Sequence, residues 1–165
     1  MSKKIATYSI LIALALIASF LERLVPISFT VPGIKLGLAN IVIVAALYLL
    51  NSRAAVAIAL VKVLVAGLLF GGASQIIFGL SGTALSLIIM IPAKKTNLFS
   101  IIGVSILGAI SHNLGQLTAA SIIVEDIRLF FYYTPALMLS GLLAGLTIGT
   151  LAFWVVKKIP SRLYS

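Results

Sequence analysis

The sequence predicts an all-α integral membrane protein, a single domain over residues 1–165 built as a bundle of six transmembrane helices. Hydrophobic residues make up 62% of the chain and charged residues 9%, whereas soluble domains average about 45–50% and about 25%. A soluble domain of this size cannot bury that much apolar surface, so the excess must face lipid. This composition excludes a soluble enzyme, a secreted disulfide scaffold and a disordered tail.

Six apolar runs, separated by prolines and charged residues, supply the expected helices. A helix needs about 20 residues to cross the hydrocarbon core, with a range of about 17–25. We expect the helices over approximately 5–21, 36–50, 54–70, 75–91, 98–124 and 135–156. The second run is short, and the fifth is long enough to be tilted. The five prolines, at positions 26, 32, 92, 135 and 160, are expected at the joints between helices.

The distribution of charge predicts the orientation of the bundle. With six spans, both termini share one side, which carries Lys3, Lys4, Arg53, Lys94, Lys95, Lys157, Lys158 and Arg162. The other side carries Arg23, Lys35, Arg128 and all three acids. The positive-inside rule therefore places both termini in the cytoplasm. Orientation also explains the net charge of +9 better than nucleic-acid binding does, because the basic residues form no run or stripe.

Small residues recur at helical spacing in several runs. Gly141, Gly145 and Gly149 repeat every four residues in the sixth run and predict close packing against a neighbouring helix. The first and third runs carry a second group, which either packs internally or receives a partner's helices: Ser9, Ala13, Ala15, Ser19, Ala55 and Ala59. The sequence leaves both uses open.

Lys62 is the most informative polar residue, because it lies near the middle of the third run. A lysine at the centre of a membrane helix costs about 2.5–3.5 kcal/mol, so it must face a cavity or a partner. No acid lies inside the runs to pair with it. This favours an anionic ligand, or a neutral polar ligand that accepts its hydrogen bonds. A structural lysine bonded to carbonyls or to an amide is the alternative.

A second polar cluster lies in the fifth run, where His112 and Gln116 share a helix face and Asn113 borders it. We expect Asn40 and Gln75 to join them and Lys62 in a cationic, amide-rich pocket. A metal site is not expected, because no second His, Cys or carboxylate lies at ligand spacing. We expect no catalytic residue and no cofactor.

The chain also lacks a means of driving transport by itself. Proton-driven carriers usually place Asp or Glu in the membrane, and none is present here. There is no Gly-rich phosphate loop ending in Lys-Ser or Lys-Thr, and the two halves show no convincing repeat. These observations predict a binding bundle that depends on another protein for energy.

The segment 22–35 is the longest expected non-helical stretch between spans. Pro26, Pro32 and Gly33 limit how it folds, so it is either a gate that closes over the pocket or a passive connector. Its length favours the gate. Lys35, at its base, would then help to attract an anion.

Several strings in the sequence resemble signatures of the Gx transporter family, also labelled heptaprenyl diphosphate synthase component I. They are PISFTVPGIKLGLANIV at 26–42, FGGAS at 70–74, LSGTALS at 80–86 and SHNLGQ at 111–116. The resemblance extends over residues 3–156. The size and topology are also similar to the substrate-binding S components of energy-coupling-factor (ECF) transporters, which are multi-pass proteins of the prokaryotic cell membrane.

This resemblance implies a function and partners. An S component binds a small-molecule nutrient and docks onto a transmembrane coupling subunit that two cytoplasmic ATPases drive. The cargo expected here is anionic or polar, such as an isoprenoid, quinone or flavin-related precursor. The synthase label does not imply catalysis by this chain, because prenyl diphosphate synthases bind magnesium through aspartate-rich clusters and the one aspartate here is Asp126.

Two other functions stay open at this point. The chain could be a membrane partner of an enzyme of isoprenoid or quinone metabolism that transports nothing. It could also be a passive pore or structural bundle, in which case ion currents would survive Lys62→Leu.

Overall fold

The computed structural model describes residues 2–24 and 37–159; 92% of these residues are helical and none is in a strand. Within these described residues, six α-helices and one π-helix follow one another: α1 (Ser2–Leu24), α2 (Leu38–Leu49), α3 (Ser52–Ala66), η1 (Gly67–Gly71), α4 (Gly72–Lys95), α5 (Ile101–Val124) and α6 (Ile127–Lys158). Each of the six predicted ranges overlaps one of the α-helices, so the all-helical prediction is confirmed.

Polar side chains define where three of the helices begin. Asn51, Ser100 and Asp126 precede α3, α5 and α6 and accept a hydrogen bond from a backbone N–H of the first turn, at 2.9, 3.2 and 2.9 Å. Such caps satisfy donors that have no partner inside the helix. The capping residues therefore help to end the short connections before α3, α5 and α6.

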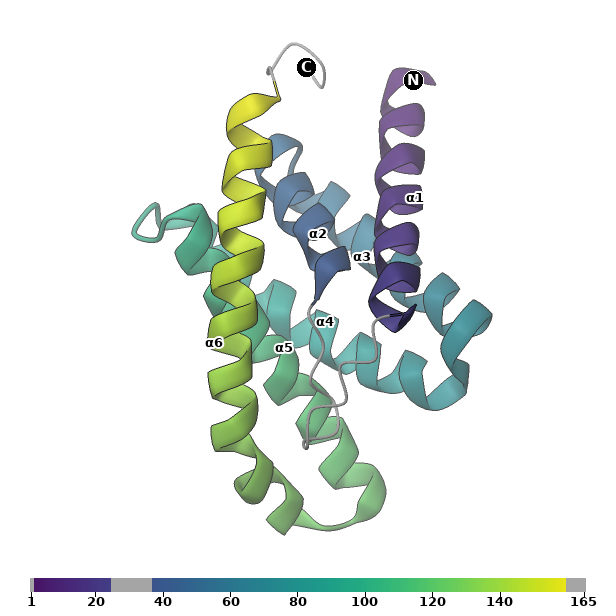
Figure 1. Ribbon diagram of the computed structural model, residues 1–165, viewed down its shortest axis with the longest axis vertical. Helices are drawn as coiled ribbons and strands as arrows, with labels where there is room; N and C mark the ends of the chain where they lie inside the picture. The colour runs from purple at the N-terminus through teal and green to yellow at the C-terminus, as the bar shows by residue number, and fades with distance from the viewer. Residues whose placement is uncertain (1, 25–36, 160–165) are drawn as a thin grey trace.

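Glycine permits the sharp turn between α3 and α4. Directly after η1, Gly72 has φ 74° and ψ −177°, a conformation that is essentially restricted to glycine. Figure 1 shows the chain reversing here, in teal at the right-hand edge, so that α4 runs back across the molecule.

In the part of the chain that the structure describes, four helical stretches are long and apolar enough to cross a membrane: Ile5–Leu24, Ser52–Lys95, Ile101–Val124 and Ile127–Lys158. The prediction was six spans. The difference arises because α3, η1 and α4 form one helical stretch of 44 residues and α2 has only 12 residues. The first turn of α1 and the last turn of α6 lie at the same end of the molecule (Figure 1). The cytoplasmic location of that end stays a prediction.

The expectation that every proline marks a joint was wrong for Pro92 and Pro135. Pro92 lies inside α4 and Pro135 inside α6, which begins at Ile127 rather than at the proline. A proline removes one backbone hydrogen bond, and membrane helices tolerate this where side chains satisfy nearby groups. In α6, the Thr134 hydroxyl donates to the Phe130 carbonyl at 2.6 Å in the same turn.

The buried core lies where five helices meet. It includes Leu47 of α2, Ile58 of α3, Met90 of α4, Val104 of α5 and Ile148 of α6. Many other large apolar side chains point outward, as expected for a surface that faces lipid. The core and the polar residues beside it therefore share the same interior.

The glycine row of α6 packs directly on the backbone of α5. Gly141, Gly145 and Gly149 are buried. They pair in order with Ile110, Ile106 and Ile102, whose Cα atoms would lie 3.0, 2.5 and 2.8 Å from a Cβ atom built on each glycine. The absence of a side chain lets the two helices approach this closely.

Candidate functional site

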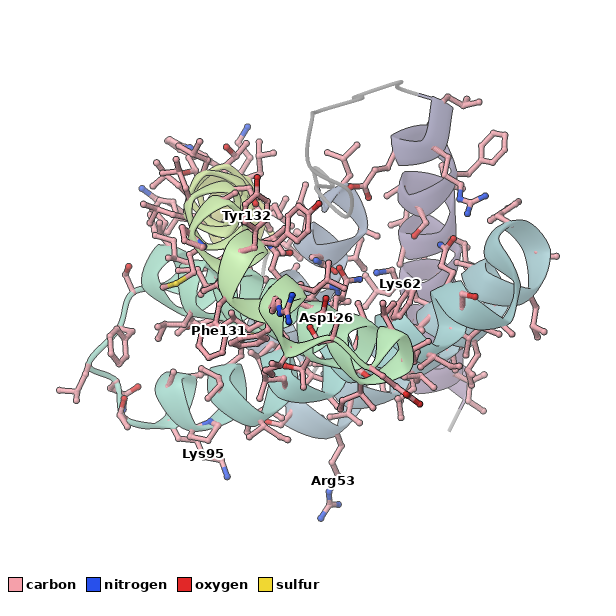
Figure 2. The ribbon with its side chains drawn as sticks, turned by 90° about the horizontal axis from the view of Figure 1, so that it is seen from below. Arg53, Lys62, Lys95, Asp126, Phe131 and Tyr132 are labelled. Carbon is pink, nitrogen blue, oxygen red and sulfur yellow. The ribbon has the colours of Figure 1, made fainter. Side chains whose placement is uncertain are left out.

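Two neighbouring helices bring Lys62 and Asn40 together. The Lys62 Nζ of α3 donates to the Asn40 Oδ1 of α2 at 3.3 Å, and both side chains are partly buried. Figure 2, seen from below, places Lys62 in the middle of the bundle, whereas Arg53 and Lys95 point outward. An ammonium group inside an apolar protein requires acceptors, and this amide oxygen supplies one.

A small, mainly apolar cavity with a few polar side chains adjoins Asn40 of this pair, between α2, α4, α5 and α6. Its volume is about 20 Å³, which is enough for roughly one water molecule. Asn40 and His112 both line it, so the structure brings these two predicted residues to the same space. The other lining residues are Ile43, Val44, Thr83, Ser86, Leu87, Met90, Ser105, Gly108, Ala109 and Ile148.

The remaining amides of the fifth-run cluster face other neighbours. The Asn113 Nδ2 donates to the Leu137 carbonyl at 2.9 Å and to the Ser140 hydroxyl at 3.3 Å, both on α6. Gln116 packs against Gly82 of α4, where a Cβ atom would lie 2.8 Å from its Cγ. Neither side chain lines the cavity. The predicted convergence of all these residues is therefore partial.

Gln75 lies at a junction between helices rather than at the cavity. Arg23, at the end of α1, donates hydrogen bonds to the Gln75 Oε1 and to the Phe70 carbonyl of η1. Its guanidinium also lies 5.8 Å from the centre of the Phe70 ring. Arg23 therefore ties α1 to the turn between α3 and α4. Four other predicted residues lie outside the described residues: Pro26, Pro32, Gly33 and Lys35.

The small residues considered for partner docking divide into two groups. Ala15, Ala55 and Ala59 are fully buried within the bundle, so a partner cannot reach them in this structure. Ser9 and Ala13 are exposed on α1, and Ser19 is partly exposed. Any docking through small residues therefore rests on α1.

None of the three acids lines the cavity. Glu22 accepts a hydrogen bond from the Gly37 backbone N–H at the start of α2, where a carboxylate complements the helix dipole. Asp126 caps α6, and Glu125 lies in the turn before it. Lys62 therefore gives the site a positive electrostatic character.

The sequence did not single out Thr83 and Ser105, which also line the cavity. Each is only 3% exposed. Isolated Ser and Thr residues are common in membrane helices, and nothing in the sequence distinguishes these two. Their relation to His112 depends on how α4 and α5 cross.

A larger groove of about 440 Å³ lies between α4 and α5 on another face. Its lining carries no charged or amide side chain and includes Ile77, Ile88 and Ile123. It therefore offers contact area to apolar chains but no group that orients a polar ligand. The polar chemistry is concentrated at the Lys62 site.

The fold and this site define a class: a helical membrane protein with a cationic, amide-containing interior site. The family described as "Heptaprenyl diphosphate synthase component I" matches residues 11–155 of the sequence. The chain belongs to that family, and the resemblance noted in the sequence is confirmed. No curated protein and no solved structure matches the chain.

Proposed function

We propose that the chain is the substrate-binding membrane subunit, or S component, of an ATP-driven energy-coupling-factor importer. The observation that carries this proposal is the Lys62–Asn40 pair, an ammonium group inside the bundle bonded to an amide at 3.3 Å. Intramembrane ionisable residues usually mark substrate or ion sites, because their insertion is costly. The absence of an energy motif in the sequence adds to this support.

The site favours a cargo that presents hydrogen-bond acceptors. Lys62 supplies donors only, and no carboxylate lines the adjoining cavity. The cavity has room for about one water molecule, so the body of a nutrient would lie outside it, on the partly exposed side of Lys62. A small anionic or polar nutrient fits this chemistry, including an isoprenoid, quinone or flavin-related precursor.

The second candidate is a membrane partner of an enzyme in isoprenoid or quinone metabolism that transports nothing itself. The description of the family to which the chain belongs favours this candidate. In either case we propose that this chain is not the prenyltransferase. Its one aspartate, Asp126, already caps α6 through a 2.9 Å bond to the Arg128 N–H, whereas diphosphate chemistry requires carboxylates that hold magnesium.

Isolation of the protein from its own membranes separates the two candidates. An S component should co-purify with a transmembrane coupling subunit and two ATPases, and its deletion should abolish uptake of one nutrient. Native mass spectrometry of the same preparation would identify a retained small molecule. Co-purification with a soluble prenyltransferase, without any uptake defect, would reject the importer and favour the partner.

Lys62→Met tests the site directly. A charge-assisted hydrogen bond contributes about 1.5–3 kcal/mol, so the variant should bind cargo roughly 10- to 150-fold more weakly. The fold should be retained, because the substitution relieves a buried charge. Lys95→Met, at an exposed position at the end of α4, is the matched control and should bind normally. Equal affinity of the two variants for cargo would show that Lys62 does not take part in binding.

A further inference from the structure

Two hydroxyl groups line the cavity without a hydrogen bond to another described residue. Thr83 of α4 and Ser105 of α5 are each 3% exposed as whole residues and line the cavity. Among the described residues neither hydroxyl makes a hydrogen bond, and neither is sealed from the cavity as the unpartnered Tyr48 and Ser121 hydroxyls are. A buried polar group without a partner is unfavourable and rare in folded proteins. The Thr83 and Ser105 hydroxyls are therefore open to a partner inside the cavity.

Other threonines of the bundle show how unusual Thr83 is. In a helix, the threonine hydroxyl commonly bonds to the carbonyl four residues earlier. Four threonines here do so, at 2.6–3.0 Å: Thr118, Thr134, Thr147 and Thr150. Thr83 does not make this bond and lines the cavity instead. Its hydroxyl is thus available for a ligand.

The size and lining of the cavity limit what that ligand can be. A volume of about 20 Å³ exceeds the roughly 10–15 Å³ that one water requires. Such a water also needs two to four polar partners. Thr83, Ser105 and His112 come from two helices and supply them, with Asn40 at the α2 side. Ser86 is already engaged, because its hydroxyl donates to the Met90 Sδ at 3.2 Å.

We infer that the cavity is a binding site for a single water molecule that bridges Thr83 and Ser105. His112 and Asn40 complete its surroundings, so the water links the α4–α5 pair to the amide that holds Lys62. The inference of a water site rests on the proposed function in one respect only. The bound water would set the position of Asn40, and Asn40 in turn would set the position of the Lys62 ammonium group that meets cargo. The water site itself requires no cargo.

Thr83→Val tests the site by the sign of its effect, because valine has nearly the same shape and lacks the hydroxyl. If Thr83 holds a water, the substitution removes a hydrogen bond, and the unfolding midpoint Tm should fall by about 2–4 °C. If the hydroxyl has no partner, its removal should raise Tm. Thr147→Val is the matched control, since Thr147 is exposed on α6 and bonds only to its own helix. A Tm equal to or above that of the control would overturn the inference.

A double-mutant cycle with Ser105→Ala tests whether the two hydroxyls share one water. Groups that bind the same molecule give non-additive effects, whereas independent groups give additive ones. The double variant should therefore lose less Tm than the sum of the two single losses, and strict additivity would overturn the bridge. Both measurements use purified protein without cargo. Their failure is distinguishable from failure of the importer proposal, which uptake and co-purification test.

Discussion

The closest contact between α5 and α6 makes Gly145 a sensitive position. A Cβ atom at Gly145 would lie 2.5 Å from the Ile106 Cα and 3.0 Å from the Ser105 carbonyl oxygen. Carbon atoms in contact normally lie about 3.5–4.0 Å apart. Both neighbours are backbone atoms, so no side-chain rotation can relieve the overlap. Gly145→Ala must therefore push the two helices apart.

The magnitude follows from two opposing terms. Overpacking costs about 1–3 kcal/mol, and we take the upper end because backbone must move. Alanine in place of glycine stabilises a helix by about 1 kcal/mol. The net loss in the free energy of unfolding is thus about 2 kcal/mol, which lowers Tm by roughly 4–8 °C for a chain of this size.

Gly103→Ala is the matched control, because it makes the same chemical change in α5. There the nearest atom to an added Cβ is the Phe99 Cβ at 3.4 Å, an ordinary contact. This variant should be neutral or stabilised by up to about 1 kcal/mol. Thermal unfolding in detergent can be followed by the fluorescence of Trp154, the single tryptophan, which lies in α6. Equal stability of the two alanine variants would refute the packing argument.

Two further predictions concern helix ends. Arg23→Ala removes the bond to the Phe70 carbonyl, so amide hydrogen exchange in segment 67–75 should accelerate, whereas the exposed control Arg53→Ala should leave it unchanged. Identical exchange in both variants would contradict the role of Arg23. Asp126→Ala removes the cap that accepts from the Arg128 N–H and should lower the free energy of unfolding by about 1 kcal/mol, measured by thermal unfolding; an unchanged Tm would contradict the cap.

The helices were predictable because each apolar run must satisfy its backbone hydrogen bonds internally once it is in lipid. The helix expected over 75–91 extends over Gly72–Lys95 in the structure, and the helix expected over 98–124 extends over Ile101–Val124. The larger error was at α6, where the proline at position 135 suggested a boundary. A proline removes one backbone hydrogen bond, but whether the helix ends there depends on how the other groups of that turn are satisfied.

The candidate site was predictable only in part. Lys62 stood out because a charge in the middle of an apolar run is costly, and its partnership with Asn40 agrees with that reasoning. His112, Asn113 and Gln116 are close in sequence, yet only His112 reaches the cavity. Residues three and four apart share a helix face, but which neighbour that face meets depends on helix crossing.

The sequence by itself determined the membrane class, the helical content and the most costly polar residue, because composition and the need for internal backbone bonding act locally along the chain. Only the tertiary structure decided which polar groups meet. Gly82, Gly115 and Gly145 set how closely α4, α5 and α6 approach, and that approach brings Thr83 and Ser105 to the cavity beside His112. Helix rotation and crossing depend on contacts between residues far apart in sequence, so a pattern within one helix does not contain them.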